Sequence, residues 1–254
     1  MELYTEEALV LDVRDLADAD RIVTYLTRSH GKKEGVAQGS RRKHSRFAGQ
    51  LQPLARVSVT WAEKPGRELT RISSVEMIRS AHRIQEDLDG IFLAAYLAEQ
   101  AAEFVQENES GELYFRLLDS TIEALLAGVQ KPLAARYYET WVLRLAGIFP
   151  PPEECPVCGR PLESRAVLPA SGEALVCGEC GGSGAGTLVV GEAVLAFLAH
   201  ASRRPLTELA ADPPSPAVLG RVEEVCARVR RAFLQRELRS YVVMERTLRQ
   251  LSEL

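Results

Sequence analysis

The sequence lacks the short motifs of the common catalytic sites. Its four histidines form no H-E-x-x-H pair, and it contains neither a G-x-x-x-x-G-K-[ST] phosphate loop nor a G-x-S-x-G elbow. We therefore predict a protein that is not an enzyme and name no catalytic residue. One alternative is a metal-dependent nuclease with magnesium held by four neighbouring aspartates, Asp12, Asp15, Asp18 and Asp20. They span a predicted strand end and turn, where aspartate is common for local hydrogen bonds.

Long apolar runs are also missing. No stretch approaches the roughly 18 consecutive apolar residues that a membrane span requires. The first seven residues, Met-Glu-Leu-Tyr-Thr-Glu-Glu, are acidic where a secretory signal would be basic. We therefore expect a cytoplasmic protein with no membrane partner. A disulfide framework is not expected there, so the spacing of the five cysteines needs another explanation.

Positive charge is scarce overall but concentrated in one segment. The 254-residue chain has a net charge of −4, yet residues 21–71 contain twelve basic and three acidic residues, a balance of +9. Lys and Arg gathered on one module of an acidic protein are typical of a surface that follows phosphates. A solvated charge run or a disordered loop would have the same composition and stays open as an alternative.

Alternating apolar residues predict five strands before residue 80. They are expected at about 8–14, 21–27, 33–38, 55–61 and 68–77. Five strands with one long loop between the third and fourth suit the OB-type β-barrel, whose exposed face and loops commonly hold single-stranded nucleic acid. An SH3-like barrel would give much the same pattern and remains open.

Aromatic residues make up only 6% of the chain, and the barrel segment, residues 1–80, holds four of them. Tyr25, Phe47 and Trp61 are candidates for stacking on bases. The stronger interpretation is that they fill the core, because Trp61 shares its strand face with Val57 and Val59.

Beyond residue 80 the apolar residues recur at three- and four-residue steps, which predicts helices. Residues 81–131 hold ten acidic and three basic residues, so we expect a scaffold or partner surface there and no DNA contact. A last helix is expected to start at Ser215-Pro216 and to carry a second basic cluster, from Arg221 to Arg249, on a solvated, salt-bridged face.

Four of the five cysteines form a metal-ligand pattern. Cys155-x-x-Cys158 and Cys177-x-x-Cys180 are each followed by glycine, and two such hairpins can arrange four thiolates around one Zn²⁺. Four thiolates fill the coordination sphere, so we predict one structural zinc ion per chain. A redox dithiol is the competing hypothesis. Cys226 lies on the apolar stripe of the last helix, where a buried core thiol is expected.

These patterns predict an α+β chain of four segments. Residues 1–80 form an OB-type DNA-binding domain and residues 81–152 the first part of a helical domain. Residues 153–186 form an inserted zinc ribbon with four cysteine ligands, and residues 187–254 complete the helical domain.

Three segments resemble the amino-terminal domain of RecO, the bacterial family of DNA repair and recombination mediators. They are Leu-Thr-x-x-x-Gly-Lys at 26–32, Gly-Ser-Arg-Arg-Lys-His-Ser-Arg-Phe at 39–47 and Gln-Leu-Gln-Pro-Leu at 50–54. Arg-Glu-Leu-Arg-Ser at 236–240 is similar to the family's last helix. The barrel-length start and the cysteine quartet within a helical region extend the resemblance to essentially the whole chain. Some members of the family lack the cysteines, which favours a structural zinc.

The resemblance implies a non-enzymatic protein that binds single- and double-stranded DNA and anneals complementary strands. With RecR it would help load RecA onto DNA coated by single-strand-binding protein, whose C-terminal tail would dock on the helices. The rival hypothesis is an adaptor whose barrel docks an acidic protein. The DNA-binding candidates are Lys32, Lys33, Arg41, Arg42, Lys43 and Arg46, with Arg67 and Arg71 as weaker ones.

Overall fold

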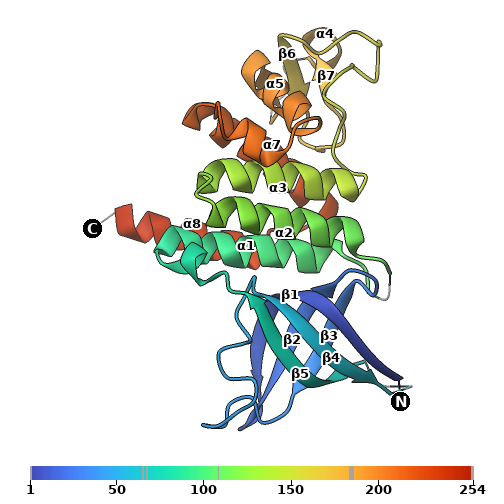
Figure 1. Ribbon diagram of the computed structural model, residues 1–254. Coiled ribbons are helices and arrows are strands. Elements are labelled where there is room, and N and C mark those ends of the chain that lie inside the picture. Colours follow the sequence, from blue (N-terminus) through green and yellow to red (C-terminus); the bar gives the residue numbers. More distant parts are fainter. Residues whose placement is uncertain (1, 65, 67, 108, 183–185, 253–254) are drawn as a thin grey trace. The chain divides into compact units, whose positions relative to one another are not determined.

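Five strands of the computed structural model close into a barrel (Figure 1). They are β1 (Glu2–Leu16), β2 (Asp20–Thr27), β3 (Lys32–Ala37), β4 (Arg56–Glu63) and β5 (Thr70–Arg79). Their order is β1-β2-β3-β5-β4, and only the β3–β5 pair is parallel. This is a five-stranded barrel of the OB type, which confirms the predicted α+β fold class. The structure describes residues 2–64, 66, 68–107, 109–182 and 186–252.

The chain divides into two compact units. The N-terminal unit comprises Met1–Leu126 and Ser240–Leu254, and the second unit comprises Ala127–Arg239. These limits differ from the segment boundaries expected at residues 80, 152 and 186, because the last helix groups with the barrel and the first two long helices. Within the described ranges, no helix has both the length and the apolar character needed to cross a bilayer.

The barrel closes through a short parallel junction between β3 and β5. Its register pairs are Gly35↔Thr70 and Val36↔Arg71. The Thr70 hydroxyl donates to the Glu34 carbonyl at 3.1 Å and also lies 3.1 Å from the Tyr25 hydroxyl. The strands approach so closely here that a Cβ built on Gly35 would lie 2.5 Å from Thr70 Oγ1. Glycine therefore avoids a steric clash at the closure.

Strand β1 begins earlier than the sequence predicts. Its first part pairs with β4, from Glu2↔Glu63 to Leu9↔Arg56, and its later part pairs with β2. Tyr4 anchors the early part because its ring stacks on Trp61 with the ring centroids 5.3 Å apart. Because residues 2–7 are acidic in composition, the alternation of apolar residues did not predict this half of the strand.

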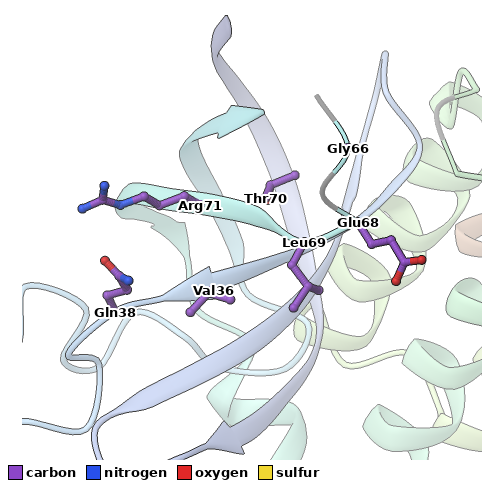
Figure 2. Close-up of a pocket in the computed structure, with 7 residues that line it drawn as sticks. All are labelled: Val36, Gln38, Gly66, Glu68, Leu69, Thr70 and Arg71. Carbon is purple, nitrogen blue, oxygen red and sulfur yellow. The ribbon is translucent and has the colours of Figure 1, made fainter. Parts of the chain in front are cut away.

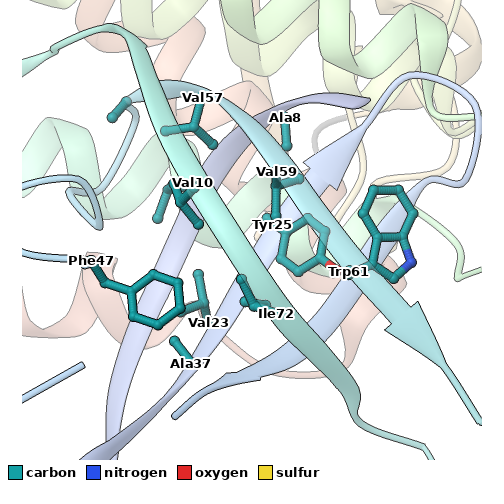
Figure 3. Close-up of a cluster of buried hydrophobic side chains, with 12 residues drawn as sticks. Ala8, Val10, Val23, Tyr25, Ala37, Phe47, Val57, Val59, Trp61 and Ile72 are labelled. Carbon is teal, nitrogen blue, oxygen red and sulfur yellow. The ribbon is translucent and has the colours of Figure 1, made fainter. Parts of the chain in front are cut away.

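The barrel core contains the three aromatic residues that were candidates for base stacking (Figure 3). Tyr25, Phe47 and Trp61 are each at most 2% exposed, which confirms that they fill the core. Phe47 comes from the long connection between β3 and β4, residues 38–55, and burying such a side chain contributes roughly 1.5–3 kcal/mol. The connection is therefore fixed to the barrel by its own side chain.

Ion pairs at the buried Asp119 carboxylate join helix α2 (Glu112–Leu126) to the barrel. The Asp119 carboxylate accepts hydrogen bonds from Arg56 at 2.8 Å and from Arg79 at 2.5 Å. Asp87 caps its helix by accepting from the amide of Gly90 at 2.7 Å. The elements are η1 (His82–Gln85), α1 (Leu88–Phe104), α2 (Glu112–Leu126) and α8 (Arg239–Ser252).

The second unit combines helices with a small sheet, and its longest helices share a buried ionic cluster. Arg136 of α3 pairs with Glu139 at 2.7 Å and with Glu223 of α7. The strands follow the order β7-β6-β8. The elements are α3 (Lys131–Leu145), β6 (Arg165–Leu168), β7 (Val176–Cys177), α4 (Gly178–Gly181), β8 (Leu188–Gly191), α5 (Glu192–Ala201), α6 (Leu206–Leu209) and α7 (Pro216–Leu234).

The prediction of one C-terminal helix is wrong, because the structure has two. Ser215 caps α7 as expected, but that helix ends at Leu234 with Gln235 as its C-cap, whose φ of 55° is left-handed, and α8 follows. Arg230 is only 1% exposed and pairs with Glu237 at 2.6 Å, so the expected solvated basic face is also wrong at this position. Cys226 is buried, as predicted.

The close approach of Gly35 to Thr70 and Ile72 leads to a prediction about the free energy of unfolding. Gly35→Ala should lower the free energy of unfolding by about 1–3 kcal/mol, because the new methyl group overpacks against Thr70 and Ile72. Gly220→Ala is the matched control: its Cβ would meet nothing within 4 Å, and it lies inside α7. The control should gain about 0.5–1 kcal/mol from helix propensity. Urea denaturation measures both, and a Gly35→Ala protein as stable as the wild type would contradict the close approach.

Candidate nucleic-acid interface and metal site

The central part of the basic segment lies on the connection between β3 and β4, and hydrogen bonds fix its backbone. The amide of Gly39 donates to Asp20 Oδ1 at 2.8 Å, and the amide of Arg41 donates to the Ala19 carbonyl at 3.0 Å. These bonds tie the connection to the β1–β2 turn, while Phe47 anchors its middle in the core. The backbone that carries the cations of this connection is therefore held in place on the barrel.

Four cations of this connection are exposed: Arg41, Arg42, Lys43 and Arg46. Arg41 is partly neutralised, since its Nη1 donates to the Ala17 carbonyl at 3.1 Å and its Nε lies 3.6 Å from Asp15. Arg46 lies over the Phe47 ring, 4.9 Å from its centroid. Arg42 and Lys43 have no side-chain hydrogen bond or ion pair with any described residue, and residues 38–55 contain no acid. Their charge is thus available to an external anion.

Lys32 and Lys33 do not belong to this exposed surface. The Lys32 ammonium donates to the Ala102 carbonyl at 2.9 Å. The Lys33 side chain is 8% exposed, and its ammonium lies 2.7 Å from Glu63 Oε1. The two lysines were expected beside the arginines because they are near in sequence. Strand β3 instead directs them to internal acceptors, so they are omitted from the interface.

Of the two weaker candidates, Arg71 alone lies within the described residues. Arg71 is exposed on β5 and lines a pocket with Val36, Gln38 and Leu69 (Figure 2). Arg67 lies outside the described residues. Val36, on β3, and Gln38, the first residue after that strand, were not among the predicted site residues.

The four cysteines of the predicted metal site converge at one end of the small sheet. The sulfur atoms of Cys155, Cys158, Cys177 and Cys180 all lie within 4.8 Å of one another. The first pair sits in a tight turn in which the Gly159 amide donates to the Cys155 carbonyl at 2.8 Å, with a Gly159 φ of 72°. The second pair spans the end of β7 and helix α4. Such a cluster could hold a metal ion.

The electrostatics of the quartet also favour a cation. Backbone amides, chiefly that of Cys177, lower the pKa of Cys155 to about 6, and the Cys180 amide lowers the pKa of Cys177. The pKa of Cys180 is raised to about 12, chiefly by its hydrogen bond with Cys177. Some thiols thus favour the thiolate form while a neighbour stays protonated. A cation at the centre would remove this conflict because it stabilises every thiolate.

Three of the four aspartates of the nuclease hypothesis have local structural partners. Asp12 lies 3.3 Å from Arg14, Asp15 lies 3.2 Å from Arg21, and Asp20 accepts from the Gly39 amide. In the part of the chain that the structure describes, the cysteine quartet is the only group of three or more potential metal ligands. The aspartates therefore give no support to a magnesium site.

Comparison with known proteins adds an independent observation. The family model described as "Recombination protein O N terminal" matches residues 1–81, and the one described as "Recombination protein O C terminal" matches residues 85–241. Two proteins named DNA repair protein RecO are similar over 247 residues. The one from Anaeromyxobacter sp. (strain K) is 32% identical, covering 97% of this chain and 96% of the relative. The one from Pelotomaculum thermopropionicum is 31% identical, covering 97% and 95%.

The ion pair of the buried Lys33 with Glu63 leads to a prediction about how stability depends on pH. Its ammonium holds the pKa of Glu63 below the ordinary value, chiefly through their hydrogen bond. The pair therefore stabilises the fold above the ordinary glutamate pKa of about 4.3, and this stabilisation is lost as the pH falls through the lowered value. Lys33→Met should cost about 1–3 kcal/mol at pH 7, and the deficit should shrink below about pH 4.

Lys43→Met makes the same chemical change at an exposed site and is the control. It should alter the free energy of unfolding by less than about 0.5 kcal/mol at either pH. Thermal or urea unfolding of both variants at pH 7 and pH 3.5 provides the measurement. Equal stability of the two variants at pH 7 would show that the Lys33–Glu63 pair is not a stabilising contact.

Proposed function

The chain belongs to the RecO family of DNA repair proteins, and on this premise we propose that it is a non-enzymatic mediator of DNA repair and homologous recombination. One observation supports DNA binding above the others. The connection between β3 and β4 presents exposed cations on a fixed backbone, and Arg42 and Lys43 have no partner among the described residues. Its ligand is a polyanion, and in this family the fitting polyanion is DNA.

Arg41, Arg42, Lys43 and Arg46 bind phosphates of the DNA backbone, and Arg71 is a further candidate. Each neutralised phosphate releases condensed counterions, which supplies affinity that falls steeply with salt. Phosphates are common to single and double strands, so this surface binds both. Lys32 and Lys33 are not included because their ammonium groups already have acceptors within the protein.

Annealing of complementary strands follows from the same surface. Two strands repel each other through their phosphates, and a cationic surface screens that repulsion. Contacts to phosphate oxygens leave the base edges available for pairing. The protein can therefore bring strands together without forming or breaking a covalent bond, and the mechanism requires no catalytic residue.

The proposed protein partners come from the family resemblance. We propose that the chain acts with RecR to load RecA onto DNA coated by single-strand-binding protein, and that the tail of that protein docks on the helices. Charge supports this division of labour: residues 81–131 carry ten acidic and three basic residues, whereas residues 38–55 carry no acid. DNA is thus directed to the barrel, while the helices remain available to proteins. The proposed place of action is the bacterial cytoplasm.

We also propose that the cysteine quartet holds one structural Zn²⁺. A tetrahedron with Zn–S bonds of about 2.3 Å has sulfur–sulfur edges of about 3.8 Å, and Cys158 Sγ lies 3.7 Å from Cys177 Sγ. Four thiolates would fill the coordination sphere, so the ion would supply folding energy and no open position for water. The residues around it form a sheet whose three strands have only four, two and four residues, shorter than the usual five to six, so a bound ion would add to a small amount of strand pairing.

The DNA-binding proposal predicts the effect of a charge reversal. Arg42→Glu combined with Lys43→Glu should weaken binding to a single-stranded oligonucleotide at least tenfold in about 50 mM salt, because two attractive interactions with phosphates become repulsive. The slope of log affinity against log salt should fall by roughly 0.7 for each phosphate that is no longer neutralised. Fluorescence anisotropy over a salt series measures both quantities.

Arg203→Glu combined with Arg204→Glu is the matched control. It also changes the charge by −4, at exposed residues of the second unit, and should leave affinity within about twofold. Association with RecR, tested by co-purification, should survive in the Arg42/Lys43 variant. Loss of RecR association with DNA binding retained would overturn the mediator proposal in favour of the adaptor.

The zinc proposal predicts that Cys158→Ser lowers the bound metal from one equivalent to well below one, because a hydroxyl is a poor zinc ligand. The second unit should then unfold at a lower temperature, since metal binding energy is folding energy. Cys226→Ala removes a thiol from a helix core outside the quartet and should retain the metal. Elemental analysis and thermal unfolding provide the measurements. A full equivalent of zinc in the Cys158→Ser protein would rule out the quartet as the site.

A further inference from the structure

A pocket of about 540 Å³ opens on the outside of the barrel where β3 meets β5 (Figure 2). This volume is within the range of about 300–1,000 Å³ found for small-ligand sites. The pocket lies beside the parallel junction, so both strands and the β4–β5 connection contribute to it. Among the described residues, its lining comprises Val36, Gln38, Gly66, Glu68, Leu69, Thr70 and Arg71.

The lining has an apolar middle between two polar ends of different charge. Val36 and Leu69 lie at the centre, and both are partly buried. Gln38 and Arg71 lie at one end, and Glu68 points away from them at the other (Figure 2). A phosphate is attracted to the Arg71 end and repelled from the Glu68 end. The charges thus orient any ligand that combines a phosphate with an uncharged ring.

The polar groups at the Arg71 end are available to a ligand. Neither Gln38 nor Arg71 makes a side-chain hydrogen bond or ion pair with any residue the structure describes. Thr70, in contrast, is buried and bonded to Glu34 and Tyr25, so it forms part of the floor. The guanidinium and the amide together offer several donors and one acceptor, which suits a phosphate and the edge of a base.

The pocket is continuous with the cationic connection between β3 and β4. Gln38 is the first residue of that connection, and a Cβ on the next residue, Gly39, would lie 3.5 Å from Arg42 Cδ. The Arg42 side chain therefore lies beside Gly39, the residue that follows Gln38 of the pocket lining. A strand held by Arg42 and Lys43 would bring its neighbouring nucleotides to the pocket.

We propose that this pocket receives one unstacked base of single-stranded DNA. The base packs against Val36 and Leu69, and its phosphate lies near Arg71. The inference rests on the proposed DNA binding and adds to it a preference for strand type. A base within a duplex cannot enter without being unstacked and unpaired, which costs a few kcal/mol. The cationic connection binds both forms of DNA, whereas the pocket favours the single strand.

The experiment compares an oligo-dT strand with an abasic strand of the same length, which keeps the phosphates and lacks the bases. The pocket variant is Val36→Ala combined with Leu69→Ala. The matched control is Val189→Ala combined with Leu113→Ala, the same changes at exposed residues elsewhere. Thermal unfolding confirms that each variant is folded. If the pocket variant does not fold, Leu69→Ala alone replaces it, because Leu69 lies outside the strands.

The wild-type protein should bind the ordinary strand about five- to tenfold more tightly than the abasic strand. The pocket variant should lose most of this ratio and keep its duplex affinity, and the control should keep both. Equal binding of the ordinary and abasic strands by the wild type would overturn the inference while leaving the proposed function intact. So would an equal loss of single-strand and duplex binding in the pocket variant. Absence of all DNA binding would overturn the proposed function and this inference with it.

Discussion

The close approach of β3 and β5 at Gly35 is the constraint on which the candidate interface depends. It lets the Thr70 hydroxyl join the Glu34 carbonyl to the Tyr25 hydroxyl, and so closes the barrel. The cationic connection begins two residues after this junction, and the β4–β5 connection ends at it. Both halves of the proposed DNA surface therefore extend from one rigid point. A barrel left open here would lose the geometry of the surface while keeping its charge.

Much of the fold could be predicted from local patterns, because each pattern is decided by neighbours in sequence. Period-two alternation indicated the five strands, and the two C-x-x-C hairpins indicated the cysteine cluster. The first half of β1 could not be predicted, since it is held by a distant residue, Trp61. The break before α8 was missed because it occurs at Gln235, which is not a usual left-handed residue.

The basic connection between β3 and β4 was predicted from composition, but charge counting overestimated the number of exposed cations. Counting treats every lysine and arginine as a surface charge, whereas Arg56 is bonded to Asp119 and Lys33 to Glu63. The position of Lys33 was within reach of the alternation argument, since it shares a strand face with Gly35 and Ala37, both buried. The partner of Arg56 was not, because Asp119 is 63 residues away along the chain.

Strands β6 and β8 of the small sheet form an antiparallel pair, and the segment between them contains the second pair of cysteines. β6 pairs with β8 in antiparallel register from Arg165↔Gly191 to Leu168↔Leu188, so the chain leaves the sheet and re-enters it at adjacent points. The intervening segment, which carries the second pair of cysteines, could be replaced by a tight turn without displacing either strand. Once that pair is gone, the first pair has no chemical reason to persist. The second cysteine pair and strand β7 could therefore be lost together while the β6–β8 pairing kept its register, at the cost of the folding energy that a bound ion would supply.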